Sequence, residues 1–230
     1  MAFVLAATFA TASAAAAAPW QAVETTHIGG YVLTVESEDG ADDSPRLVIA
    51  APGGHTTTLS LNGGLAAVKD AMTTKSLAAL NTLNSKYLYA TDALKDRASG
   101  DRLVLVFGAA EDPDPWAIRV LHLAANGQVQ TVFSEDAFEL TAIADLNKDG
   151  VPELIGRPSY SQMDNRCIAT YDPQAVYRLS GGSYVYDEAL SKTYNLTHRY
   201  VWAGPHSRED VGVDLCNKSG PKLVPAPKTG

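Results

Sequence analysis

The sequence predicts a mainly β (α+β) fold, built as one domain of antiparallel sheet with a small helical insertion. Short segments rich in β-branched and aromatic residues recur along the chain, separated by clusters of Gly, Pro, Asn and Asp. Asn126-Gly127 stands between two such segments and is typical of a two-residue β-hairpin. Only residues 63–96 depart from this pattern, because their apolar residues recur at helical spacing.

The expected strands follow from β-branched and aromatic content, bounded by turn residues. The segment Arg102–Phe107 is continuously apolar, which predicts a central strand buried on both faces. In chain order, the expected strands are Ile28–Glu36, Arg46–Ala50, Thr56–Leu61, Arg102–Phe107, Ala117–Leu123, Gln128–Phe133, Phe138–Ala144, Val176–Leu179 and Tyr184–Tyr186.

The aromatic segment from Tyr194 to Trp202 is interpreted as an edge strand or a lid. In a strand, Tyr200 and Trp202 would alternate onto one face, which suits stacking of a sugar or peptide. The alternative is half-buried packing, the common role of Tyr and Trp in strands.

Residues 1–18 have the features of a signal peptide. An apolar stretch is followed by small residues, and Ala12-Ser13-Ala14 matches a cleavage site, although no Lys or Arg lies near Met1. The alternative is a disordered alanine-rich tail. We expect a single β-rich domain over 19–218 and a disordered, Pro-rich tail over 219–230. Export would place the protein outside the cell, in the periplasm or in the cell envelope.

The composition excludes some partners. The 230 residues are 46% hydrophobic and 19% charged, which is ordinary for a globular protein. The net charge is −8 and basic residues are not clustered, which argues against nucleic acid and anionic membrane surfaces. No apolar stretch is long enough for a transmembrane helix. The expected partner is therefore an unidentified protein or glycan.

The chain has two cysteines, Cys167 and Cys216. In an exported protein they are expected to form one disulfide, with two buried free thiols as the alternative. No Cys-x-x-Cys pair supports redox catalysis or a zinc site.

The stretch Ala144–Leu154 reads A-D-L-N-K-D-G-V-P-E-L and specifies a chemistry. Side-chain oxygens stand at positions one, three, five and nine, a backbone carbonyl at position seven and Gly150 at the bend. Such spacing suits a hard cation with six to eight oxygen ligands, hence one structural calcium ion. An EF-hand is excluded because its twelfth position would be Gly156 rather than Glu. An empty polar turn is the alternative. The predicted ligands are Asp145, Asn147, Asp149, Val151 and Glu153.

Flanked by two apolar segments, this loop resembles the calcium loops of FG-GAP and VCBS-type repeats of integrin-like β-propellers. The resemblance covers Asp145 through Ile155, in a single copy, and implies a strand–calcium loop–strand unit with a structural metal. The segments 171–179 and 194–205 also look like parts of secreted bacterial proteins with such a loop. A β-propeller fragment is the alternative fold, although no repeat at a propeller period is evident.

These observations favour an exported, calcium-stabilised module with a binding or surface-interaction role over an enzyme. A structural component of an envelope assembly is the second hypothesis and a secreted hydrolase the third. The hydrolase has little support, because the sequence has neither a Gly-x-Ser-x-Gly nor a His-Glu-x-x-His motif.

Overall fold

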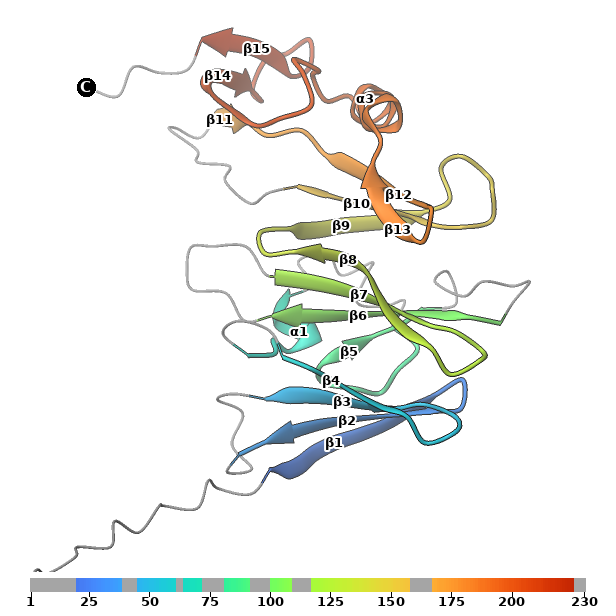
Figure 1. Ribbon diagram of the computed structural model, residues 1–230. Coiled ribbons are helices and arrows are strands. Elements are labelled where there is room, and N and C mark those ends of the chain that lie inside the picture. Colours follow the sequence, from blue (N-terminus) through green and yellow to red (C-terminus); the bar gives the residue numbers. More distant parts are fainter. Residues whose placement is uncertain are drawn as a thin grey trace, which may run out of the picture.

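The structure is a computed structural model that describes residues 20–38, 45–60, 64–71, 81–91, 100–108, 117–157 and 167–225. The described residues form four antiparallel sheets, three with four strands and one with three. The sheets follow one another along the molecule in approximate chain order (Figure 1). The predicted antiparallel, mainly β fold is therefore confirmed.

The N-terminal sheet is a meander in the order β1-β2-β3-β4. The expected first strand, Ile28–Glu36, is two strands, because Gly29 and Gly30 have positive φ values of 55° and 84° and form the turn between them. Two consecutive positive φ values suit the tight hairpin turn that matches strand twist. The strands are β1 (Gln21–Ile28), β2 (Tyr31–Ser37), β3 (Arg46–Ala50) and β4 (Thr56–Leu59).

The central sheet has the order β5-β6-β7-β8. Its β7–β8 hairpin turns at Asn126-Gly127 as predicted, and Gly127 has a φ of 91°. Of the expected helical insertion, the described residues contain the short helix α1 (Val68–Ala71), while 72–80 and 92–99 lie outside them. The strands are β5 (Leu88–Tyr89), β6 (Arg102–Gly108), β7 (Ala117–Leu123) and β8 (Val129–Glu135).

The third sheet has the order β9-β10-β12-β13. A two-residue turn at Gly181 and Gly182, both with positive φ, joins its last two strands, as the sequence predicts. Helix α3 (Glu188–Thr197) follows and packs against β12. The strands are β9 (Glu139–Ala144), β10 (Glu153–Arg157), β12 (Ala175–Ser180) and β13 (Ser183–Tyr186).

The C-terminal sheet has the order β11-β14-β15, with β11 (Ile168–Tyr171), β14 (Arg208–Asp214) and β15 (Lys222–Pro225). The predicted disulfide joins Cys167 and Cys216 directly beyond the first β11–β14 residue pair, Ile168 and Asp214. The prediction of a disordered tail from residue 219 is wrong for Lys222–Pro225, because these residues add a third strand to the open edge of β14.

Two apolar cores lie on opposite faces of the central sheet. Val104 and Val106 of β6 join the core shared with the N-terminal sheet. Leu103, Leu105 and Phe107 of the same strand join the core shared with the third sheet. The prediction that this segment is a central strand buried on both faces is therefore confirmed.

A tyrosine fixes the N-terminal sheet to the central one. The buried Tyr31 of β2 donates its hydroxyl hydrogen to the region of the β7–β8 turn, where the carbonyls of Ala124 and Gln128 lie 2.6 and 2.8 Å away. At the same turn, a Cβ on Gly127 would approach the Pro52 carbonyl oxygen to 2.8 Å. Only glycine fits this position, so the turn sequence also serves the packing between the sheets.

The expected edge strand at Tyr194–Trp202 is wrong. Its first residues belong to α3, which begins after Asp187, whose carboxylate accepts a hydrogen bond from the Leu190 N–H. The buried face of α3 is polar. Ser191 Oγ accepts the Val176 N–H, and the Asn195 amide bonds both the N–H and the carbonyl of Gln174.

The polar face of α3 does what a neighbouring strand would otherwise do. Its side chains form hydrogen bonds with backbone N–H and carbonyl groups where β12 begins. A helix with a polar buried face lacks the apolar period by which helices are predicted.

The expected signal peptide lies outside the described residues. Among the described residues, no helix has the length and apolar character needed to cross a membrane.

We expect replacement of both cysteines by serine to loosen the C-terminal sheet first. The chain-entropy model gives a loss of about 4 kcal/mol for a crosslink between residues separated by 49 positions. Few buried apolar residues hold this sheet, so its backbone should open without global unfolding. Hydrogen exchange followed by mass spectrometry would show faster exchange in 208–214 and unchanged exchange in 102–108. Equal acceleration in both segments would contradict this expectation.

Candidate metal centre

The predicted calcium loop joins two paired strands. β9 ends at Ala144 and β10 begins at Glu153, and these two residues are register partners across the ladder. The loop from 145 to 152 therefore closes a hairpin of the third sheet. The strand–loop–strand arrangement predicted from the sequence is present.

Hydrogen bonds between residues close in sequence fix the backbone of the loop. Asp145 Oδ2 accepts the Gly150 N–H at 3.1 Å. Asn147 Oδ1 accepts the Asp149 N–H at 2.9 Å, and Asp149 Oδ1 accepts the Val151 N–H at 2.8 Å. The side chains at positions one, three and five thus each accept a hydrogen bond from a backbone N–H of the same loop.

Two loop residues have left-handed backbone conformations, Lys148 with a φ of 64° and Gly150 with a φ of 88°. Nothing lies within 4 Å of a Cβ built on Gly150. Glycine is therefore needed at this bend for its conformation and not for space, as the sequence motif implies.

Glu153 lies beneath the loop and is 1% exposed. Its Oε2 accepts the Leu146 N–H at 2.6 Å. Burial is the main cause that raises the pKa of the Glu153 carboxyl, the Leu146 N–H opposes it, and the carboxylates of Asp149 and Asp145 raise it further. The charges of Asp149 and Asp145 thus act on the buried Glu153 carboxyl.

A tyrosine anchors the end of the loop. The hydroxyl of Tyr184, on β13, donates to the Pro152 carbonyl at 2.9 Å. Burial, with smaller contributions from the Glu153 and Asp149 carboxylates, raises the pKa of Tyr184 well above its ordinary value. The phenol therefore stays protonated and holds the loop against the third sheet.

The donor set fits a hard cation. Asp145, Asp149 and Glu153 supply carboxylates, Asn147 an amide oxygen and Val151 a backbone carbonyl, which are the oxygen ligands that calcium takes. No ion pair within the described residues neutralises any of the three carboxylates. The described part of the chain also contains no cluster of three or more His, Cys, Asp and Glu side chains placed to hold a metal by themselves.

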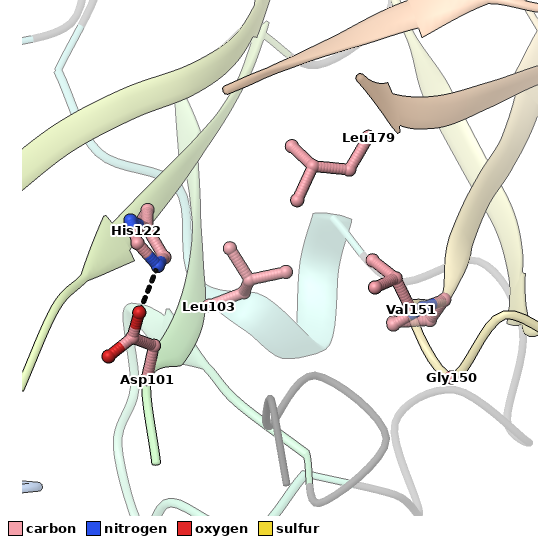
Figure 2. A pocket seen from close by; sticks show the side chains of 7 residues that line it. Asp101, Leu103, His122, Gly150, Val151 and Leu179 are labelled. Carbon is pink, nitrogen blue, oxygen red and sulfur yellow. Dashed lines mark hydrogen bonds and ion pairs between the residues drawn. The ribbon is translucent and has the colours of Figure 1, made fainter. Parts of the chain in front are cut away.

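A small pocket of about 60 Å³ lies beside the loop, between it and the central sheet. Figure 2 shows Val151 of the loop facing Leu103 and Leu179, with His122 and Asp101 on the other side. His122 Nε2 lies 3.0 Å from Asp101 Oδ2, so the ring of this β7 residue is hydrogen-bonded. The pocket is mainly lined by aliphatic side chains, so it is suited to a small apolar group.

The remaining predicted site residues lie outside the loop and have separate roles. Cys167 and Cys216 form the disulfide of the C-terminal sheet. Tyr200 and Trp202 belong to no strand, and both are half-buried. The Tyr200 ring stacks on Tyr171, with ring centroids 6.4 Å apart and planes 24° apart. This contact corresponds to the packing alternative for Tyr200, while ligand contact by either aromatic residue stays a prediction.

No protein-family model, curated protein or solved structure matches this chain. The resemblance to FG-GAP and VCBS-type repeats therefore stays a prediction, carried by the loop residues alone.

Sequence reasoning missed Tyr184 and the Asp101–His122 pair as neighbours of the loop. Each comes from a strand or loop distant in sequence, and no local spacing signals that the third sheet would bring them together. The Asn-Gly and Gly-Gly turns were readable because their signal is local.

Two substitutions at the left-handed residues of the loop test its backbone conformation. We expect Gly150→Ala to lower the free energy of unfolding by about 1–2 kcal/mol, the cost of a Cβ in left-handed backbone. Lys148→Gly should change it little, since relief of the same strain offsets the larger entropy of glycine in the unfolded chain. Urea unfolding in a chelator-containing buffer measures both. Equal effects of the two substitutions would contradict the described loop.

Proposed function

We propose that the protein is an exported, β-rich binding module in which one calcium ion stabilises the β9–β10 loop. The observation that carries the proposal is the set of three carboxylates around one loop, with Glu153 buried and none of the three ion-paired within the described residues. Buried charges in proteins are paired or bind metals, because an isolated charge is costly to remove from water.

Asp145, Asn147, Asp149, Val151 and Glu153 would hold the ion. Bound calcium supplies two positive charges, which offset the mutual repulsion of the carboxylates. Its role would be structural, since all five ligands come from one short segment of the chain. The residues themselves keep the loop closed through bonds from Gly150, Asp149 and Val151 to side-chain oxygens.

The same loop supports a binding role over a catalytic one. It forms one wall of the pocket that contains Val151, and Tyr184 ties it to the third sheet, so metal binding would rigidify a surface between two sheets. The Cys167–Cys216 disulfide is compatible with an oxidising compartment, which supports the proposed export.

Calcium titration tests the metal site. We expect saturable binding of one ion by calorimetry and a higher thermal midpoint, because a ligand that binds only the folded state at a hundred times its Kd stabilises it by about 2.7 kcal/mol. Asp149→Ala should abolish both effects, since it removes a ligand and the bond to the Val151 N–H.

Asp70→Ala is the matched control, because Asp70 is an exposed carboxylate on α1, outside the loop. It should bind calcium as the unmodified protein does. Absence of heat and of any midpoint shift at millimolar calcium would reject the metal site. Equal loss of binding in both variants would assign the effect to general charge and not to the loop.

A further inference from the structure

A groove runs along the outer edge of the central sheet. It has a volume of about 260 Å³ and lies where β8 and β13, edge strands of adjacent sheets, approach each other. Its lining residues are Thr131, Val132, Phe133, Ser134, Glu135, Ser183 and Tyr184.

The lining of this groove identifies it as a strand edge. Side chains of a strand alternate between its two faces, so a pocket on one face is lined by every second residue. Here five consecutive residues of β8, Thr131–Glu135, line the groove. Consecutive residues have the backbone in common, so the groove follows the backbone of β8.

Within the described residues, no strand pairs with the outer edge of β8. In this part of the chain β8 pairs with β7, and β13 pairs with β12. Among the described residues, no backbone hydrogen bond joins β8 to β13, and the polar link between them is the Gln130 side chain, which donates to the Gly182 carbonyl at 3.1 Å. The Glu135 carbonyl accepts from the Arg119 guanidinium, which closes one end of the edge.

An edge strand with unpaired peptide groups is a template for another strand. Five residues span about 17 Å, which is the length of a short added strand. The bulge at Val132, where the β7–β8 register shifts, interrupts a longer flat edge and limits pairing to a short segment.

The charge of the groove indicates which kind of molecule would bind there. Glu135 lies in the lining, and within the described residues it has no ion pair, whereas the Asp136 carboxylate that follows it is ion-paired with the Arg119 guanidinium at 2.5 Å. Burial, and then the Asp136 carboxylate, raise the pKa of Glu135, while Arg119 lowers it. The whole chain has a net charge of −8, which disfavours a second copy of the protein as the occupant.

We propose that β8 binds a short, extended peptide of another protein that carries Lys or Arg, by adding it as an outer strand to the central sheet. Main-chain hydrogen bonds to the edge of Thr131–Glu135 provide affinity, and the basic side chain faces Glu135. The proposal makes specific the partner of the proposed binding module, and it does not require the calcium loop.

The test begins with selection from a displayed library of random heptapeptides on the full chain, in calcium buffer and in chelator. We expect enriched peptides to contain Lys or Arg among β-branched residues. Absence of any enriched peptide in both buffers would overturn the proposal. Loss of the calcium effects described above, with peptide binding intact, would reject the metal site and leave this inference standing.

Two N-methylated forms of one synthetic enriched peptide then test strand addition. Methylation of alternate amides in one register removes the hydrogen bonds to β8 and should weaken binding at least about tenfold, whereas methylation in the other register faces solvent and should change it little. Equal effects in both registers would show side-chain docking without an added strand, and would overturn the proposal.

Glu135→Gln tests the charge with little change in shape, and Glu38→Gln is its matched control at an exposed carboxylate directly after β2. We expect Glu135→Gln to weaken the basic peptide about two- to fivefold, the range of a partly exposed ion pair, and Glu38→Gln to have no effect. Hydrogen exchange should slow in 131–135 when the peptide binds. Protection elsewhere, or equal weakening by the two variants, would contradict the site.

Discussion

Burial of the central sheet on both faces is the constraint on which the rest of this structure depends. The strand β6 has apolar side chains that alternate between two separate cores, so neither face can be left in water. One face needs the N-terminal sheet and the other needs the third sheet. The order of the sheets along the molecule therefore follows from one short apolar segment (Figure 1).

Polar contacts fix turns and loops where the cores end. Tyr31 of the N-terminal sheet bonds to the β7–β8 turn of the central sheet, and Tyr184 of β13 bonds to the end of the β9–β10 loop within the third sheet. Both tyrosines have a buried ring and a hydroxyl that donates to a backbone carbonyl. Hydrophobic burial sets which sheets pack, the Tyr31 bonds align the N-terminal sheet with the central one, and the Tyr184 bond fixes the loop within its own sheet.

The two candidate binding regions both lie where the third sheet meets the central one. The β9–β10 loop faces the central sheet through Val151, and the β8 edge lies beside β13. Adjacent sheets pack through their faces, so their loops and edges are the parts left available to other molecules. The loop groups the carboxylates of Asp145, Asp149 and Glu153, and Glu135 lies at the β8 edge, so both proposals are for positively charged ligands.

The sequence by itself determined the local features of this protein. Turns can be predicted from the sequence at Gly150, Asn126-Gly127 and Gly181-Gly182, because a positive φ depends on the identity of a single residue. The spacing of Asp145, Asn147 and Asp149 in the loop, and the continuously apolar segment of β6, were readable because each is a local pattern.

Only the tertiary structure decided which distant segments meet. The polar face of α3, the strand β15 and the neighbours of the loop depend on backbone groups left unpaired by other elements. Such unpaired groups exist only after the sheets have formed, so no local pattern of residues can report them.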